Sequence, residues 1–345
     1  MADKTYRVAI IGTGGIARSH ARSWAATGRA ELVAAVDIND DAAQAFGDEY
    51  GIPARYTGHE AMLGAEKPDI VSICTWHGTH PSLTVASAQA GVAGILCEKP
   101  MAVNLADADA MLAACRESGT QLAIGHHHRF SARNTEARRQ IAAGAIGAPH
   151  MLRVAVGGGL TNNGTHAIDG ARYLLGDPAA EWVIGQVERR TDRYERKEPI
   201  EDLCMGLVGF EGGARLVLES DMPDGGLNAG AARLGGLQVY GTEGTLTVGD
   251  AVTLSSPRGA AVDVDVPADT NQYDELLAWM EGGATHRNEA TNARATVELM
   301  MAIYESARRR GLVSLPLDPG PSPLVAMIDD GSLAVEKPGR YDIRL

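Results

Sequence analysis

The fold is decided by the stretch Tyr6-Arg7-Val8-Ala9-Ile10-Ile11-Gly12-Thr13-Gly14-Gly15-Ile16-Ala17. Its apolar start predicts a strand, its glycines predict a tight turn, and the residues after them favour a helix. In a mononucleotide-binding unit Gly12 permits the turn, Gly14 lets the backbone approach a pyrophosphate, and Ala17 lets the helix pack closely on the strand. The helix N-terminus, at Gly15 and Ile16, then offers unpaired N–H groups to the phosphates.

A second apolar run, Glu31–Val36, ends at Asp37, about where an acidic residue reaches the adenosine ribose. Glycine turns are common without any ligand, but strand, turn, helix, strand and acid in this order predict a dinucleotide site. We expect NAD rather than NADP, because the Asp37 carboxylate binds ribose hydroxyls and repels a 2′-phosphate. The following residues, 38–41, contain no arginine to bind that phosphate.

Length and composition limit the possible function classes. A chain of 345 residues is too long for one typical core and predicts two domains. A formal charge of −13 argues against binding to nucleic acid or to an anionic membrane. The sequence has no signal-like apolar start, and no segment approaches the roughly 18 to 20 apolar residues that span a bilayer. Four scattered cysteines, two of them inside apolar runs, predict a reduced, cytoplasmic protein.

Residues 1–125 alternate short apolar runs with alanine-rich, helix-like segments, which predicts a parallel sheet with helices on both faces. Ligands of such sheets bind at the carboxyl ends of the strands. The expected strands are 6–11, 31–36, 69–74, 94–97 and 121–124, and the expected helices are 16–26, 40–49, 81–90 and 105–117.

The pattern changes after about residue 148, and residues 126–315 are predicted to form an α+β substrate domain with a largely antiparallel sheet. Helices are expected at 165–175, 274–280 and 289–309, and we expect the later two to return to the first domain. Residues 316–345 form a tail that is either an ordered arm or a flexible end. The expected strands are 152–156, 182–190, 203–210, 214–219, 237–240 and 245–248.

Glu98-Lys99-Pro100, placed after a Gly-x-Gly-x-x-Ala unit, resembles the motif of the Gfo/Idh/MocA oxidoreductases. Ser72-Ile-Cys-Thr75 with His80, Gly164-Thr-His166 and residues 239–244 continue the resemblance over residues 5 to about 315. It implies an α/β Rossmann domain plus an α+β domain with a large open, mainly antiparallel sheet. It also implies NAD-dependent hydride transfer at a secondary alcohol of a sugar, cyclitol or related polyol, and dimers or tetramers built on that sheet.

The chain departs from the family pattern in three places. The family helix often begins Asp-x-Gly-x-His, whereas this chain reads Asn162-Asn163-Gly164-Thr165-His166 and lacks that acid. Only residues 157–161 separate the preceding strand from this motif, which predicts a more open pocket or one completed by another subunit. The C-terminal tail is longer than usual.

Lys99 and His166 are the expected catalytic residues. Lys99 hydrogen-bonds the reacting oxygen and stabilises developing alkoxide charge, and His166 accepts the hydroxyl proton. The alternatives are a surface lysine and a histidine near a helix start. Glu98 is expected to bind the nicotinamide ribose or to orient Lys99, and its alternative is a purely structural pairing with Lys99. The resemblance also favours a cis Lys99–Pro100 bond, which aims Lys99 into the cleft.

Other candidates surround these residues. Thr75, His77 and His80 are expected to line the nicotinamide site, with helix capping as the alternative for His80. His128 and Arg129 are expected in the substrate pocket, with a structural role as the alternative for Arg129.

Arg153 faces either the cleft or solvent. Asn162 and Asn163 either bind substrate, Asn162 also by orienting His166, or provide the helix N-cap. The run His126–His128 does not predict a metal site, because consecutive strand residues alternate faces.

Two further functions fit the same fold: a redox-neutral glycosidase or isomerase that retains NAD, and a non-catalytic dinucleotide sensor. The presence of both Lys99 and His166 argues against the sensor. We also expect a homo-oligomer, because the strands present more apolar positions than helix 165–175 covers. These positions are Leu203, Leu207, Leu216, Leu218, Leu237 and Val239.

Overall fold

The computed structural model of the chain describes residues 4–221, 236–256, 259–263 and 270–342. By its internal contacts the chain divides into two compact units. The first unit contains residues 4–103, 107–126 and 270–293, and the second contains the remaining described residues. The return segment 270–293 therefore belongs with the N-terminal residues, whereas the helix that follows it continues into the second unit from residue 294 on.

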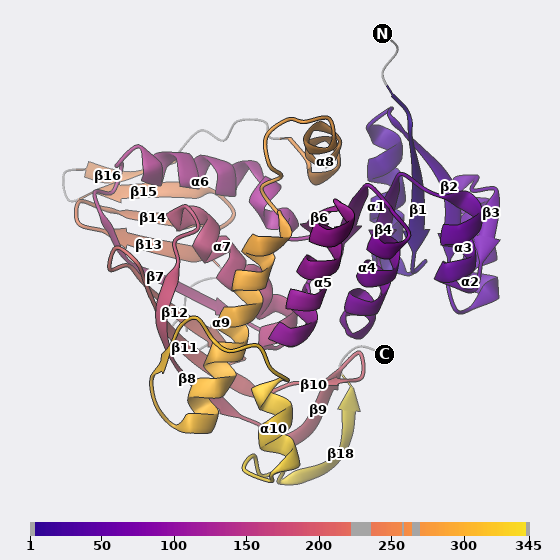
Figure 1. Cartoon of the computed structure of the whole chain (residues 1–345). Coiled ribbons are helices and arrows are strands. Elements are labelled where there is room, and N and C mark those ends of the chain that lie inside the picture. Colours follow the sequence, from indigo (N-terminus) through magenta and orange to yellow (C-terminus); the bar gives the residue numbers. More distant parts are fainter. Residues whose placement is uncertain (1–3, 222–235, 257–258, 264–269, 343–345) are drawn as a thin grey trace. The chain divides into compact units, whose positions relative to one another are not determined.

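The first unit is built on a six-stranded parallel sheet with the order β3-β2-β1-β4-β5-β6 (Figure 1). This order is that of the dinucleotide-binding doubly wound fold. The strands are β1 (Tyr6–Ile11), β2 (Ala30–Val36), β3 (Ala54–Tyr56), β4 (Ile70–Ile73), β5 (Gly94–Cys97) and β6 (Gln121–Ile124). The helices are α1 (Gly15–Ala26), α2 (Asp40–Tyr50), α3 (His59–Glu66), η1 (His77–Thr79), α4 (His80–Gln89), α5 (Leu105–Ser118, from residue 107 on) and α8 (Gln272–Met280).

The sequence did not predict β3 or α3. Strand β3 has three half-buried residues and shows no apolar alternation, so only its pairing with β2 identifies it. The return segment closes a core around the buried Trp24, whose ring meets that of Tyr273 edge-on at 5.0 Å between centroids. Leu276 and Leu277 of α8 pack into the same core.

The second unit is built on a nine-stranded sheet with the order β16-β15-β14-β13-β7-β12-β11-β8-β17. Neighbouring strands are antiparallel except β7 and β12, which are parallel. Its strands are β7 (Pro149–Val156), β8 (Ala180–Glu188), β11 (Leu203–Phe210), β12 (Arg215–Ser220), β13 (Leu237–Gly241), β14 (Thr245–Val248), β15 (Val252–Ser256), β16 (Gly259–Asp263) and β17 (Val313–Ser314). The helices of this unit are η2 (His127–Phe130), α6 (Ala132–Ala142), η3 (Leu160–Gly164), α7 (Thr165–Leu175), α9 (Ala290–Arg309, from residue 294 on) and α10 (Pro323–Asp329).

The described part of the C-terminal tail is an ordered arm. After α10, strand β18 (Lys337–Asp342) pairs in parallel with β9 (Thr191–Glu195). Together with β10 (Glu198–Pro199) these strands form a separate three-stranded sheet. The ordered alternative is therefore the one that the structure shows for residues 316–342.

Helices α7 and α9 cover one face of the nine-stranded sheet (Figure 1). A Cβ on Gly170 of α7 would contact Leu237, and Cβ atoms on Gly185 and Gly206 would collide with Ile303 of α9. Leu216, Leu218, Leu237 and Val239 are four of the apolar positions expected to exceed the cover of helix 165–175, and they are buried, because α9 covers this face together with α7. Leu203 and Leu207 point to the opposite face, since neighbouring strand residues alternate sides.

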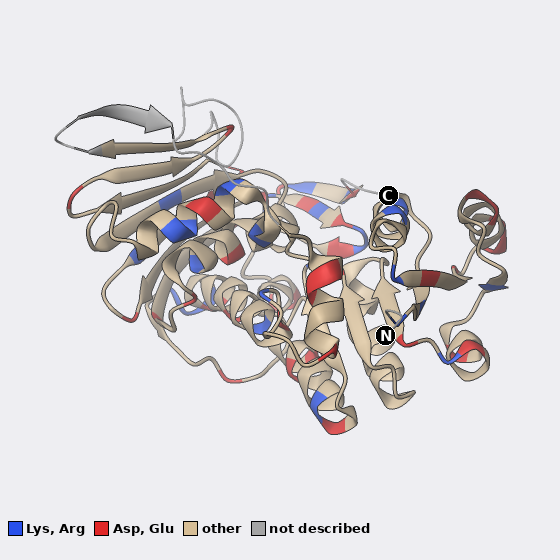
Figure 2. Cartoon of the chain, turned by 90° about the horizontal axis from the view of Figure 1, so that it is seen from above, with Lys and Arg blue, Asp and Glu red and all other residues tan. Residues whose placement is uncertain are grey.

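Basic and acidic residues are interspersed along the described helices and strands (Figure 2). This mixed pattern accompanies the net charge of −13. Among the described residues, the structure has no helix with the length and apolarity needed to cross a bilayer.

We expect Gly185→Ala to destabilise the protein by about 1–3 kcal/mol, because overpacking forces backbone shifts. The added Cβ would lie 2.6 Å from the carbonyl oxygen of Ile303. Denaturant unfolding measures the effect, and Gly249→Ala is the matched control because a Cβ on Gly249 would meet no described atom within 4 Å. Equal stability of the two variants would contradict the close helix–sheet approach.

Candidate functional site

The glycine turn after β1 is locked between two neighbouring strands. Gly12 donates its N–H to the carbonyl of Val36 at 2.8 Å, and Cys74 donates to the carbonyl of Ile11 at 2.7 Å. Gly12 has a φ of +88°, and a Cβ there would lie 2.9 Å from the Cys74 carbonyl. Both the backbone angle and the close approach therefore require glycine at this position.

The N-terminus of α1 is open to a ligand. Gly14 is the N-cap residue and, among the described residues, no side chain caps it. A Cβ on Gly14 or Gly15 would meet no described atom within 4 Å, and Ile16 is exposed. Uncapped amides at the positive end of a 12-residue helix fit a phosphate group.

Asp37 is fixed beside this turn at the end of β2. Its Oδ2 accepts hydrogen bonds from both the N–H and the hydroxyl of Thr13 at 2.9 Å, and its Oδ1 accepts the N–H of Asn39 at 3.0 Å. The predicted acid thus lies next to the predicted glycine turn. Thr13 joins them, a role that no pattern in the sequence predicts.

Glu98 is buried at the end of β5 and oriented from two sides. Its Oε1 lies 3.0 Å from Nε2 of His20, and its Oε2 accepts the N–H of Lys99 at 3.2 Å. Burial opposes ionisation of Glu98, but the hydrogen bond to His20 and the charge of Lys99 outweigh it, so the pKa of Glu98 lies below the ordinary value. Glu98 thus contacts the backbone of Lys99, the residue that it is expected to orient. The Lys99–Pro100 bond is cis, as expected, and Lys99 is half-buried.

The loop after β4 brings Thr75, His77 and His80 to the same sheet edge. The ring of His80 lies between two backbone carbonyls, with Nδ1 2.9 Å from the oxygen of Pro100 and Nε2 3.2 Å from that of Thr75. His80 therefore ties this loop to the turn that carries Lys99. His77 is buried in η1, and Thr75 accepts a hydrogen bond from Thr79.

In the second unit, three imidazole rings come together. The ring of His166, near the start of α7, stacks on His128 with centroids 4.4 Å apart and meets His127 at 5.0 Å. The rings of His127 and His128 meet at 4.5 Å. The structure thus brings the predicted His128 and His166 into contact and adds His127. Across the described residues, no group of three or more His, Cys, Asp or Glu side chains is arranged to hold a metal ion.

Asn162 and Asn163 lie in η3, the turn before α7. The N-cap of α7 is Gly164, so the N-cap alternative for these asparagines is wrong. Asn163 donates its Nδ2 to the carbonyl of Gly157 at 2.5 Å, which occupies it in the turn itself. Asn162 is buried.

Two carboxylates hold the chain that leads into η3. Asp221 accepts the N–H groups of Gly158 and Gly159 at 2.8 and 2.7 Å. Glu201 accepts the N–H of Leu160 at 2.6 Å and the hydroxyl of Tyr304 at 2.7 Å. Burial raises the pKa of Glu201. No local sequence pattern predicts the role of either acid, since their partners are remote along the chain.

The contacts of Arg129 are those of a structural residue, which was the alternative to a role in substrate binding. Its buried guanidinium donates two hydrogen bonds of 2.8 Å to Asp169 and two more, of 2.7 and 3.0 Å, to Asp177. Arg153 pairs in register with Val217 and Gln238, while α7 packs over the face of Leu237. Strand alternation therefore points Arg153 to the face opposite α7 and His166.

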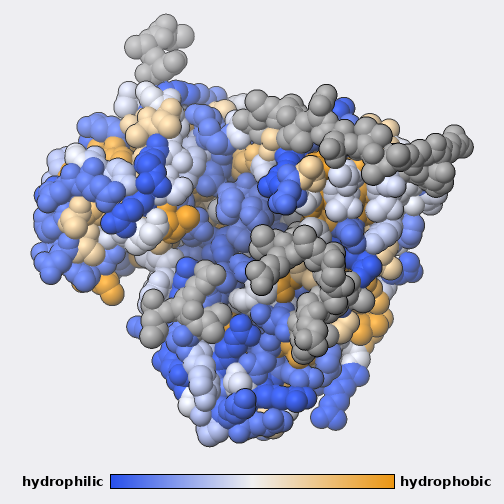
Figure 3. Space-filling model, turned by 180° about the vertical axis from the view of Figure 1, so that it is seen from behind, coloured by the Kyte–Doolittle hydropathy of each residue, from blue (hydrophilic) through white to orange (hydrophobic). Residues whose placement is uncertain are grey.

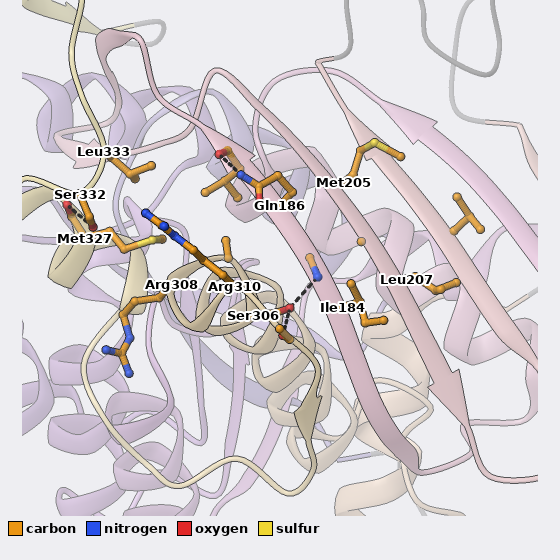
Figure 4. Close-up of a pocket in the computed structure, with 16 residues that line it drawn as sticks. Ile184, Gln186, Met205, Leu207, Ser306, Arg308, Arg310, Met327, Ser332 and Leu333 are labelled. Carbon is orange, nitrogen blue, oxygen red and sulfur yellow. Dashed lines mark hydrogen bonds between the residues drawn. The ribbon is translucent and has the colours of Figure 1, made fainter.

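A cavity of about 770 Å³ lies in the second unit, beside β8 and the C-terminal end of α9 (Figure 4). Its lining includes Ile184, Met205, Arg310 and Met327, and Ser306 there accepts the N–H of Gly185 at 2.8 Å. The cavity contains none of the predicted site residues.

Two parts of the chain match models of one family. Residues 6–126 match the part described as an oxidoreductase family with an NAD-binding Rossmann fold, and residues 153–315 match its C-terminal alpha/beta domain. The chain is 29% identical to a D-apiose dehydrogenase of Paraburkholderia graminis, over 96% of this chain and 95% of that protein. It is 32% identical to a 1,5-anhydro-D-fructose reductase of Ensifer adhaerens, over 75% and 83%.

A solved structure shows the same fold. The WlbA dehydrogenase from Bordetella pertussis, in complex with NADH and UDP-GlcNAcA, superposes with a TM-score of 0.77 and 24% identity, over 91% of this chain and 100% of that chain. The two family matches together cover most of the residues that form the parallel sheet and the nine-stranded sheet. The chain therefore belongs to the Gfo/Idh/MocA family of oxidoreductases, which have an NAD-binding Rossmann fold.

Proposed function

We propose that the protein is an NAD-dependent dehydrogenase or reductase acting on a secondary hydroxyl of a sugar, cyclitol or related polyol. The observation that carries this proposal is the turn at the end of β5, where buried Glu98 holds the backbone of Lys99. The names of the relatives, D-apiose dehydrogenase and 1,5-anhydro-D-fructose reductase, support a sugar as the substrate class.

When bound, NAD supplies the acceptor for the hydride that leaves the carbinol carbon. We assign to Lys99 a hydrogen bond to the reacting oxygen, whose negative charge the ammonium stabilises as it develops. His166 takes the hydroxyl proton, so that the C–O bond becomes a carbonyl. Stacking on His128 and contact with His127 fix the imidazole plane of His166.

The cofactor site that we propose uses the parts of the first unit that fit a dinucleotide. The amides of Gly14, Gly15 and Ile16 bind the pyrophosphate, and Asp37 binds the adenosine ribose. Thr75 and His77 line the nicotinamide end, with His80 holding their loop. Asn162 and His128 are the substrate-binding side chains that we retain, whereas the contacts of Arg129 and Asn163 favour structural roles.

We expect Lys99→Met to lower kcat by about 10²-fold or more and to leave NAD affinity within a few-fold, because the lost interaction belongs to the transition state. His166→Asn should remove the limb of the pH–rate profile that reports the base. The assay follows reduced nicotinamide by absorbance with a panel of sugars and polyols.

Loss of NAD affinity with normal turnover at saturation in Lys99→Met would show instead that Lys99 anchors the cofactor. Wild-type protein that retains NAD on purification, and shows no net turnover of added NAD, would favour the redox-neutral enzyme.

We expect tighter binding of NAD than of NADP, and we expect Asp37→Ser to reduce this preference by about tenfold or more by removing the repulsion of a 2′-phosphate. Fluorescence titration with the reduced cofactors measures both affinities. Asp41→Asn is the control, because it removes one negative charge from an exposed acid in the first turn of α2 and leaves Asp37 in place. Equal affinities in the wild type would contradict the assignment of Asp37.

We propose further that the protein is a homo-oligomer joined through the outer face of the nine-stranded sheet, which is the face opposite α7 and α9. Ile184 is 45% exposed and Met205 is 39% exposed on this face, next to half-buried Leu203, Leu207 and Val217. Figure 3 shows apolar patches on the part of the molecule that carries this sheet. Exposed apolar surface of this kind favours association with a second copy.

We expect a mass of at least twice 36.2 kDa in dilute solution, measured by analytical ultracentrifugation. Met205→Glu should shift the protein toward monomer by placing a charge in the contact. Val335→Glu is the control, since Val335 is exposed but lies outside this sheet. A wild-type monomer would contradict the proposal.

We also propose a cytoplasmic location. The four cysteines are free and buried. Burial raises the pKa of each thiol, and for Cys115 the value is about 11. Buried, protonated thiols support a protein that resides in a reducing compartment.

A further inference from the structure

We propose that His20 is a positioning residue for Lys99 and acts through Glu98. The inference rests on the proposed function, in which Lys99 contacts the reacting oxygen. His20 lies on α1, far along the chain from the turn that it contacts, and its side chain is only 1% exposed. Its Nε2 lies 3.0 Å from Oε1 of Glu98.

The other side of the His20 ring is held by a chain of hydrogen bonds. Nδ1 of His20 lies 3.1 Å from Oγ of Ser72, and the indole N–H of Trp24 donates to that Oγ at 2.8 Å. An indole N–H is only a donor, so the Ser72 oxygen accepts from Trp24 and can donate its own hydrogen to Nδ1. With that arrangement Nε2 of His20 carries the hydrogen that Glu98 accepts.

The walls of the network restrict both side chains. The ring of Tyr273 meets the ring of His20 edge-on at 5.5 Å. A Cβ on Gly125 would lie 2.9 Å from Oε1 of Glu98, so the glycine at the end of β6 makes the space that this carboxylate occupies. Packing and hydrogen bonding therefore define one orientation of Glu98.

The orientation of Glu98 matters because its second oxygen accepts the N–H of Lys99 at 3.2 Å. The Glu98 carboxylate thus links α1, through His20, to the backbone of Lys99. Without the bond from His20, the charge of Glu98 would lose its buried partner. The carboxylate would then turn to other donors and release the Lys99 amide.

The first test measures the Lys99 amide and needs no turnover. We expect His20→Leu to increase hydrogen–deuterium exchange at Lys99 by about tenfold or more, since exchange follows local opening. His20→Gln places an amide N–H near the position of Nε2 and should restore most of the protection. His286→Leu is the matched control, because His286 is also 1% exposed in the same unit and bonds to the backbone of Gln272 and Asn288.

The second test measures kcat, KM and NADH affinity. His20→Leu should lower kcat by about tenfold or more with NADH affinity within about threefold, because the loss concerns the placement of Lys99 and not cofactor binding. His20→Gln should recover most of kcat. His286→Leu should lower the unfolding temperature to a similar extent and leave kcat near the wild-type value.

A double-mutant cycle then shows whether His20 acts through Glu98. Glu98→Gln removes the negative charge through which His20 is proposed to act. The double variant should therefore have a kcat no more than about twofold below that of the single variant with the lower kcat. Losses that multiply in the double variant would overturn the proposal. Wild-type exchange at Lys99 in His20→Leu would overturn it as well.

Together these measurements distinguish a failure of the role proposed for His20 from a failure of the proposed function. An active wild type with normal kcat and normal Lys99 exchange in His20→Leu refutes the role of His20 and leaves the proposed function intact. A wild type that turns over none of the sugars and polyols refutes the proposed function. In that case, increased exchange in His20→Leu still establishes the link from His20 to the Lys99 backbone.

Discussion

The buried carboxylate of Glu98 is the interaction on which the arrangement of the first unit depends. Strand β5 ends one residue before Glu98, α1 provides His20, and Gly125, which follows β6, provides the space. A buried carboxylate is costly unless it is paired and hydrogen-bonded, so these elements must meet for the unit to be stable. The same requirement places the backbone of Lys99 at the carboxyl end of the sheet.

Carboxylates that accept backbone N–H groups recur at loops of both units. Asp37 holds the glycine turn through Thr13, and Asp221 with Glu201 holds the turn before η3. Loops need such partners, because their amides are not satisfied by a helix or sheet. In each case the acid lies in another part of the chain than the loop that it holds. The conformation of the loop therefore depends on how the strands next to the acid and the loop pack together.

The second unit shows the same division between scaffold and site. The place of Arg129 after β6 predicts a substrate ligand, but two carboxylates occupy its buried guanidinium. A buried arginine must be paired, and Asp169 and Asp177 are distant in sequence and provide that pairing. His166, His128 and His127 instead form an accessible ring cluster, in which two of the three residues are exposed.

The sequence by itself determined the parallel sheet, the glycine turn, the acid at Asp37 and the turn that carries Lys99. These features follow from local patterns: apolar runs of strand length, glycine where the backbone needs it, and the rule that ligands meet the carboxyl ends of parallel strands. Only the tertiary structure decided which side chains satisfy Glu98, which face of the sheet Arg153 occupies, and that α9 continues into the second unit from residue 294 on. Those outcomes depend on strand register and on contacts between residues far apart in the chain, which no local pattern specifies because burial and pairing are settled only when the elements pack.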